Sequence, residues 1–246
     1  MSEVDLVVLE DGAAVAGDVA SRLLGRLEQV QASGGVAQIG LTGGSIADAM
    51  HRELARRAAD SSVDWSRVVV WWGDERFVDS GSGDRNARQA REAFLDQLPL
   101  DPAHVHEVPA ADQVESAEAA AADYAAAVQA HGGGRFDVLM LGLGPDGHVA
   151  SLFPGHPALS VDDRVAVAVH DSPKPPPDRV SLTFGALNRA SSVWFLVSGD
   201  DKAEAVARAR SIDSPTASDV AECPGRGVRG QDETLWIIDE AAASQL

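Results

Sequence analysis

The sequence predicts an α/β fold in which a mostly parallel sheet carries helices on both faces. The short segments 68–72 and 138–141 are apolar throughout, as is typical of strands buried on both faces of a parallel sheet. Segments with helical spacing of apolar residues alternate with the expected strands, and this alternation indicates parallel β-α-β units. The length of 246 residues fits one large α/β domain or two small ones.

The first half of the chain alternates regularly between strands and helices. Segment 13–30 has apolar residues at helical spacing and is followed by Gly34 and Gly35, which interrupt helices. The polar segment 79–86 is expected to be a loop, and Pro99 ends the helix after it. Strands are expected at 4–9, 36–41 and 68–72, and helices at 13–30, 46–58, 87–97 and 114–129.

The second half continues the pattern around a glycine-rich turn. The strand at 138–141 stops at 142–147, which contains three glycines that allow backbone angles other residues resist. The proline-rich segment 172–177 is expected to be a rigid loop, because strands flank it closely. Strands are expected at 138–141, 165–169, 180–183, 192–197 and 235–238, and a helix at 201–210.

Composition limits the partners and the compartment. The chain has 38 acidic and 20 basic residues, a net charge of −18, which argues against nucleic-acid and anionic-membrane binding. Cys223 is the only cysteine, so no intrachain disulfide can form and a reducing compartment is expected. The N-terminus lacks signal-peptide features, and no apolar run approaches the ~20 residues that span a bilayer. We expect a cytoplasmic monomer.

Four polar clusters follow expected strands, at 42–45, 74–76, 146–148 and 198–202. The carboxyl ends of parallel strands share one edge of a sheet, so these clusters can converge on one pocket. Within the third cluster, a neutral His148 suits general-base work near pH 7, and Asp146 can fix its tautomer. The alternative is a tight Pro-Asp-Gly turn beside a solvated histidine.

The cluster Thr42-Gly43-Gly44-Ser45 lies between an expected strand and an expected helix. Glycines let backbone N–H groups approach a ligand, and a helix N-terminus favours an anion. The alternative is a helix start capped by Ser45. The cluster lacks the Gly-Lys-Ser/Thr ending of a nucleotide P-loop, and no GxGxxG fingerprint follows the strand.

Three cations and one acid lie at element boundaries. Lys202 lies in the first turn of an expected helix, where a cation is unfavourable for the helix dipole, which suggests an anionic partner. Arg179 can bind phosphate with two parallel hydrogen bonds, and Arg76 is a third candidate. Asp74 could orient a sugar hydroxyl or a histidine. Each of these residues alone is also consistent with a solvated surface charge.

Other catalytic motifs are absent from the sequence. The remaining histidines have no HExxH or other compact ligand spacing, and one cysteine disfavours a structural zinc site. No GxSxG elbow is present, which disfavours a serine hydrolase. We therefore expect no metal; for a hydrolase, His148 acting on water is the simplest route.

The segment from Gly144 to Pro154, GPDGHVASLFP, resembles the signature of the 6-phosphogluconolactonases. Four other blocks match that family in order, so the resemblance spans nearly the whole chain. They are Thr42-Gly43-Gly44-Ser45, Trp72-Gly73-Asp74-Glu75-Arg76-Phe77-Val78, Arg179-Val180-Ser181-Leu182-Thr183 and Ser198-Gly199-Asp200-Asp201-Lys202-Ala203.

The resemblance implies a single domain over 1–246 with a modified Rossmann-like, mostly parallel sheet of the sugar-phosphate isomerase/lactonase type. The implied reaction is hydrolysis of 6-phospho-D-glucono-1,5-lactone to 6-phosphogluconate, the second step of the oxidative pentose phosphate pathway, without a cofactor. His148 would activate water, with Asp146 and Asp74 supporting it or binding sugar hydroxyls. Thr42, Gly43, Gly44, Ser45, Arg179 and Lys202 would hold the phosphate, and Arg76 could face either the phosphate or a structural acid.

Small departures from the family pattern leave two alternatives open. Thr42 replaces a usual serine and keeps its hydroxyl, Val149 replaces a common threonine, and Arg85 stands where serine is usual. A related glucosamine-6-phosphate deaminase would typically carry Phe-Asn-Glu-Pro after the DGH turn, but Ser151-Leu152-Phe153-Pro154 has no carboxylate. A non-catalytic sugar-phosphate sensor would need the cations but not Asp74, Asp146 and His148 together.

Overall fold

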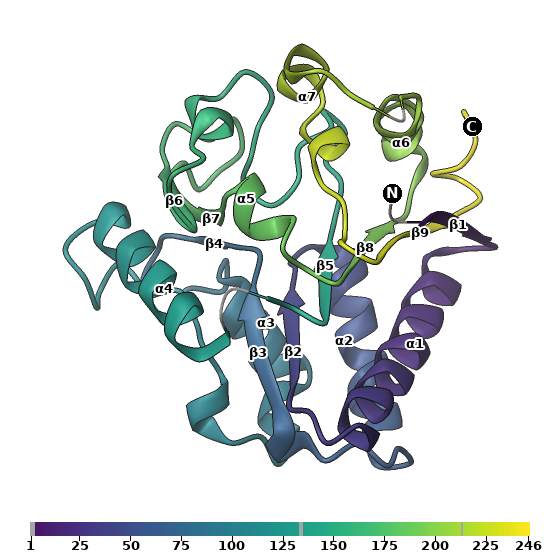
Figure 1. Cartoon of the computed structure of the whole chain (residues 1–246), viewed down its shortest axis with the longest axis vertical. Helices are drawn as coiled ribbons and strands as arrows, with labels where there is room; N and C mark the ends of the chain where they lie inside the picture. Colours follow the sequence, from purple (N-terminus) through teal and green to yellow (C-terminus); the bar gives the residue numbers. More distant parts are fainter. Residues whose placement is uncertain (1–2, 133–134, 213) are drawn as a thin grey trace.

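A six-stranded parallel sheet forms the centre of the computed structural model, which describes residues 3–132, 135–212 and 214–246 (Figure 1). Every neighbouring pair in this sheet is parallel, so the predicted fold class is confirmed. Its strands, in spatial order, are β1 (Glu3–Leu9), β9 (Glu233–Asp239), β8 (Ser192–Val197), β5 (Val138–Leu141), β2 (Ala37–Leu41) and β3 (Val68–Trp72).

Helices cover both faces of this sheet because its strands are apolar on both sides. Val68, Val70 and Trp72 pack into the core beneath one group of helices, whereas Val69 and Trp71 pack into the core on the opposite face. This alternation follows from the two-residue period of a strand. The first group is α1 (Gly12–Ala32), α2 (Ser45–Ala58) and α3 (Asn86–Ala93), and the second includes α4 (Ala117–Gly132) and α6 (Ala203–Arg210).

A second, antiparallel sheet stands beside the first, and the sequence did not predict its first strand. It contains β4 (Asp74–Arg76), β7 (Arg179–Leu182) and β6 (Ala166–Val169), in that order. The segment 74–76 was expected only as a polar cluster after a strand, because its charged residues hide its strand character. The chain crosses between the sheets at Gly73, whose N–H donates to Leu41 O (3.0 Å) while its carbonyl accepts from Leu182 N (2.9 Å).

Most predicted elements are present, but three predicted helices differ in their bounds and two short helices were not predicted. The expected helix 87–97 ends at Ala93 and resumes as a 3₁₀ turn, Leu95–Gln97, because Phe94 leaves the helical conformation (φ −155°). The helix expected from 114 begins at Ala117, where the Ser116 hydroxyl accepts a hydrogen bond from Ala119 N (3.2 Å). The helix expected at 201–210 starts as a 3₁₀ turn, Asp200–Lys202. The short helices α5 (Phe184–Leu187) and α7 (Ala217–Glu222) were not predicted.

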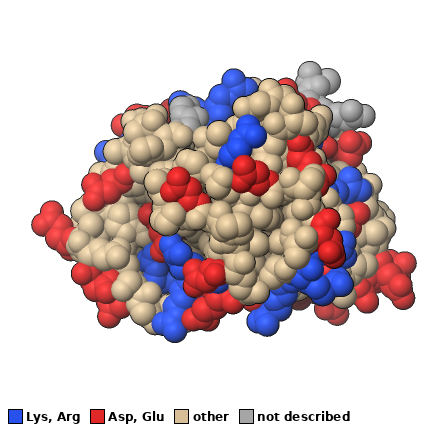
Figure 2. All heavy atoms as spheres, turned by 90° about the horizontal axis from the view of Figure 1, so that it is seen from below, with Lys and Arg blue, Asp and Glu red and all other residues tan. Residues whose placement is uncertain are grey.

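Charges are mixed on the lower face of the molecule as drawn in Figure 1. Figure 2 shows that acidic and basic side chains are interspersed there, without a large area of one sign. Among the described residues, no helix is both long enough and apolar enough to cross a bilayer.

The buried imidazole of His51 makes the stability of the fold sensitive to mild acid. His51 lies in α2, is 2% exposed and stacks on Phe94 with ring centroids 4.7 Å apart. Its Nε2 has no hydrogen-bond partner in the part of the chain that the structure describes, and burial lowers the pKa of His51 to about 4. Below pH 6.5 the unfolded chain therefore takes up a proton that the folded chain refuses, so stability falls as the pH drops toward 4.

We predict that His51→Leu removes this acid-sensitive part of the unfolding free energy. Between pH 7 and pH 5 the wild type should lose about 2 kcal/mol more than the variant, measured by urea unfolding at both values. Glu75, whose pKa burial raises to about 7, has the opposite pH dependence but is common to both proteins. His104→Leu at the surface is the matched control; equal losses in wild type and His51→Leu would contradict the prediction.

Candidate active site

The predicted site residues meet in one pocket at the carboxyl ends of β2, β5 and β8, beside the second sheet. Its volume is about 280 Å³. All the predicted residues except Asp146 line it, namely Thr42, Gly43, Gly44, Ser45, Asp74, Arg76, His148, Arg179 and Lys202. Asp146 lies directly behind His148. The four polar clusters therefore converge as expected for the carboxyl edge of a parallel sheet.

A tight turn after β5 holds His148 against Asp146. His148 Nδ1 lies 2.5 Å from Asp146 Oδ1, and Gly144 N donates to His148 O (2.9 Å). Partial burial acts to raise the pKa of Asp146, but the hydrogen bond and charge of His148 outweigh it and lower that pKa to about 2. An ionised carboxylate at Nδ1 fixes the proton on that nitrogen and leaves Nε2 to accept another.

Two glycines give this turn its shape. Gly147 has φ +89°, in the region that favours glycine. A side chain on Gly144 would collide with the imidazole and the carboxylate together. Glycine is therefore needed at both positions: at Gly147 for the backbone angle, and at Gly144 to leave space for the contact between His148 and Asp146.

Asp74 is a buried carboxylate in the wall of the pocket. It is 7% exposed, and its Oδ2 accepts a hydrogen bond from Ser151 Oγ at 2.6 Å. Ser151 N in turn donates a hydrogen bond to Ser181 Oγ (3.2 Å) on β7. Asp74 thus ties the second sheet to the segment that follows His148.

The turn between β2 and α2 presents a helix N-terminus to the pocket. The cap residue is Gly44 (φ +98°) and not Ser45, so the cap position provides no side-chain hydrogen bond to the N–H groups of the first turn. Thr42, Ser45 and Ile46 line the pocket beside these groups. The positive end of a 14-residue helix is suited to an anion.

The cations of the pocket bond mainly to neutral oxygens. Arg179 donates to the carbonyls of Pro176 (3.1 Å) and Lys174 (3.0 Å), and burial lowers its pKa. Arg76 donates to Asn86 Oδ1 and to Asp84 O (3.2 Å), while its Nε has no acceptor among the described residues. Because neutral oxygens do not cancel a guanidinium charge, these side chains can still attract an anion.

Lys174 and Asn86 also line the pocket, and sequence reasoning missed both. Burial lowers the pKa of Lys174, with Asp146 opposing and the charges of Lys202 and Arg179 adding to the effect. The proline-rich segment around Lys174 was interpreted only as a rigid loop. The sequence did contain a signal, namely the rarity of lysine: the chain has two, Lys174 and Lys202. The structure shows that both line this pocket.

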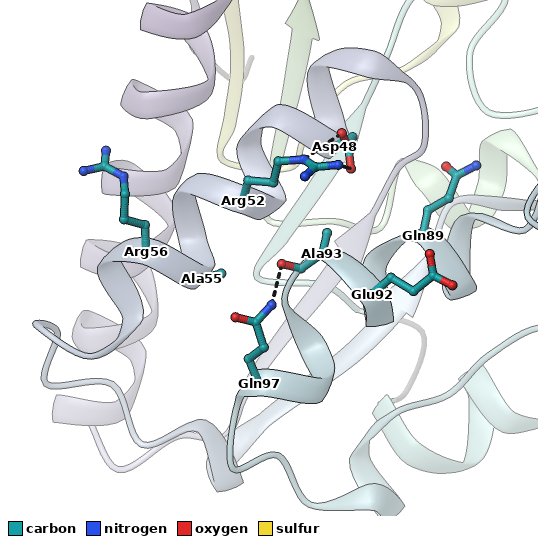
Figure 3. A pocket seen from close by; sticks show the side chains of 8 residues that line it. All are labelled: Asp48, Arg52, Ala55, Arg56, Gln89, Glu92, Ala93 and Gln97. Atoms are coloured by element: carbon teal, nitrogen blue, oxygen red, sulfur yellow. Dashed lines mark hydrogen bonds and ion pairs between the residues drawn. The ribbon is translucent and has the colours of Figure 1, made fainter.

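A larger hollow between α2 and α3 lacks comparable chemistry. Figure 3 shows its lining side chains, around a volume of about 750 Å³. Arg52 bonds to Asp48 (3.0 Å) one turn away, and Gln97 Nε2 donates to Ala93 O (3.0 Å). Its ionisable groups are surface residues paired along their own helices. Among the described residues, no three His, Cys, Asp or Glu side chains are grouped to hold a metal ion.

Comparisons with known proteins identify relatives over nearly the whole chain. Residues 10–236 match the family described as glucosamine-6-phosphate isomerases/6-phosphogluconolactonase. A 6-phosphogluconolactonase of Streptomyces coelicolor is 46% identical over 255 residues, covering 98% of this chain and 94% of that protein. One from Mycobacterium tuberculosis is 41% identical over 232 residues, covering 92% and 91%.

Solved structures agree with the architecture. That of 6-phosphogluconolactonase from Thermotoga maritima has a TM-score of 0.83 at 27% identity, covering 97% of this chain and all of that one. The Trypanosoma brucei enzyme of the same name gives 0.83 at 25%, with full coverage of both chains. A monomeric glucosamine-6-phosphate deaminase gives 0.80 at 18%, covering 98% and 100%, and so shares the fold alone.

We predict that Gly43→Ala destabilises the protein by about 1–3 kcal/mol, the usual range for overpacking. The added Cβ would collide with the Asn86 side chain. Asn86 cannot easily move, because its Nδ2 donates to Asp74 O (2.9 Å) and its N to Glu75 Oε1 (2.7 Å). Urea unfolding measures the effect. Gly142→Ala is the control, since its Cβ would meet no atom within 4 Å; equal stability of the two variants would refute the collision.

Proposed function

Because this chain belongs to the family of glucosamine-6-phosphate isomerases and 6-phosphogluconolactonases, we propose that it hydrolyses 6-phospho-D-glucono-1,5-lactone to 6-phospho-D-gluconate, with His148 as the base. The observation that carries the proposal is the His148–Asp146 contact of 2.5 Å inside a pocket that also gathers the cations. A lactone hydrolase needs a base for water and an anchor for the phosphate, and this pocket offers both.

The phosphate is anchored by the α2 N-terminus and the cations around it. Backbone N–H groups at Gly43 and Gly44 and the hydroxyls of Thr42 and Ser45 supply donors. Arg179, Lys202 and Arg76 supply positive charge from the other pocket walls. Anchoring the phosphate places C1 of the lactone at His148 and converts remote binding into orientation.

At the other end of the substrate, water adds to C1 of the lactone. His148 Nε2 takes a proton from the attacking water as the C1–O bond forms, and the carbonyl electrons move onto oxygen. When the tetrahedral intermediate collapses, the bond from C1 to the ring oxygen breaks and the imidazolium returns the proton to that oxygen. Asp146 stabilises the transient imidazolium, and Asp74 holds a sugar hydroxyl.

We propose that Lys174 stabilises the negative charge that develops on the carbonyl oxygen of C1. Its ammonium is half-buried and interacts electrostatically with Asp146, which lies behind the base. A cation in this pocket near the base would stabilise the oxyanion that forms on the carbonyl oxygen of C1. Lys202, in the 3₁₀ turn Asp200–Lys202 that follows β8, remains with the phosphate.

The deaminase and sensor alternatives fit less well. The deaminase neighbour shares the fold at 18% identity, and the segment Ser151-Leu152-Phe153-Pro154 has no carboxylate with which to open a sugar ring. Ser151 instead bonds to Asp74. A sensor would not need a histidine paired with an ionised aspartate. We also propose that the protein works as a monomer without a cofactor.

We predict that His148→Gln lowers kcat/KM for 6-phosphogluconolactone by roughly 10²–10⁴-fold, the usual contribution of a general base. Affinity for 6-phosphogluconate should change little, because the phosphate ligands remain. The lactone should be generated fresh and assayed near pH 6.5, since it opens unaided in base.

Background rates from both wild type and variant would overturn the lactonase assignment. Ammonia release from glucosamine 6-phosphate would then support a deaminase, whereas binding without turnover would support a sensor. If the variant hydrolyses the lactone as fast as the wild type, His148 is not the base, whereas the lactonase assignment stands.

We predict that the two lysines act on different ends of the substrate. Lys202→Met should reduce the preference for 6-phosphogluconolactone over unphosphorylated gluconolactone about 10-fold or more, because a charge-assisted bond is worth roughly 1.5–3 kcal/mol. Lys174→Met should lower kcat for both lactones and leave their ratio intact. Initial rates on both substrates measure this, and a collapsed ratio in Lys174→Met would move Lys174 to the phosphate site.

A further inference from the structure

A small basic cavity lies between the C-terminal end of α6 and strand β9, away from the pocket described above. Its volume is about 120 Å³, and Arg210, Arg226 and Arg229 line it together with Trp236 and Thr234. Three arginines around one cavity are unusual in a chain with a net charge of −18. Its size matches a single tetrahedral oxyanion rather than a large ligand.

Arg210 has a charge that the described part of the chain does not neutralise. Its guanidinium lies over the Trp236 ring, 5.7 Å from the centroid. Stacking occupies the face of the guanidinium, so its N–H groups, which point along the plane, still require hydrogen-bond acceptors. Nη1 is buried and has no hydrogen-bond partner within residues 3–132, 135–212 and 214–246, and burial is the cause that lowers the pKa of Arg210.

The neighbouring Arg226 is held in place by other contacts. Its Nε donates to Arg208 O (2.8 Å), its Nη2 donates to Ser211 Oγ (3.1 Å), and Nη1 lies 3.5 Å from Asp219 Oδ1. This arginine is fixed before any ligand arrives, so little side-chain entropy would be lost on binding.

We propose that this cavity, centred on Arg210, binds a phosphate-type oxyanion, either free phosphate or the phosphate group of a small monoester. Buried donors without acceptors are rare in folded proteins, and an oxyanion would supply the missing acceptor and the missing negative charge. Two links connect the cavity to the separate catalytic pocket. Helix α6 begins directly after Lys202, and Gly225 N of the cavity wall donates to Gly147 O (2.9 Å) in the His148 turn.

Site-resolved arginine modification tests the proposal without using catalytic activity. The wild-type protein is treated with phenylglyoxal, with and without inorganic phosphate, and modified arginines are located by peptide mass spectrometry. Modification of Arg210 should become about tenfold slower when phosphate is at ten times its Kd, with a saturable dependence. A parallel series with glycerol 3-phosphate distinguishes the two ligands. Stronger protection of Arg210 by glycerol 3-phosphate than by inorganic phosphate supports a monoester, and weaker protection supports free phosphate.

Arg26 is the matched internal control. It also stacks on a tryptophan, 5.9 Å from the Trp194 centroid, but it is paired with Glu233 at 3.0 Å, so neither anion should protect it. Crystals soaked in selenate should show an anomalous peak beside Arg210 in the wild type and in Arg26→Leu but not in Arg210→Leu. Unprotected Arg210 together with no peak at this cavity would overturn the proposal, whatever anion binds at the catalytic pocket.

Discussion

The carboxylate of Glu75 joins strand β4 of the second sheet to helix α3 beside the candidate active site. It is 1% exposed and accepts hydrogen bonds from the N–H groups of Arg76, Asn86 and Ala87. Burial raises its pKa to about 7, against the opposing effects of Arg85 and these N–H groups. Through it, strand β4 is fixed to the start of α3, and Asn86 is held where it can bond Arg76 and fill the space beside Gly43. Losing any partner would leave a buried carboxylate short of donors, which is costly.

The second sheet gives the pocket a wall that the parallel sheet alone could not supply. Parallel strands bring the 42–45 turn, His148 and Lys202 to one edge, but all of these groups approach from one side. Strand β7 and the loop before it add Arg179 and Lys174 from the other side, and Arg179 fixes that loop by bonding its carbonyls. In the proposed reaction, one wall of this pocket would hold the phosphate of the sugar while His148 acts at the other end of the substrate.

Sequence analysis predicted the strands whose buried residues are apolar, but it did not predict the strand whose buried residues are charged. The strands 68–72, 138–141 and 192–197 have the predicted ends, because continuous burial favours apolar residues, which occupy every position except Ser192. Strand β4 could not be found this way, since Asp74 and Glu75 are buried with partners from Ser151 and α3 that only the folded chain brings near. The convergence of the polar clusters followed from topology. Lys174 was missed because the prolines around it indicate a loop and say nothing about which way it faces.

The pairing of its basic residues explains how so acidic a chain can attract a phosphate. On the surface, arginines are matched by carboxylates one turn away, as in Arg22 with Asp18, Arg52 with Asp48 and Arg88 with Glu92. Such exposed pairs add little stability, but they cancel charge. In the pocket, Arg179 and Arg76 bond to neutral carbonyl and amide oxygens instead, while Lys202 bonds to the exposed Asp201. The guanidinium charges of Arg179 and Arg76 are therefore not cancelled by hydrogen-bonded carboxylates, and they can attract an anion to the pocket although the chain as a whole is acidic.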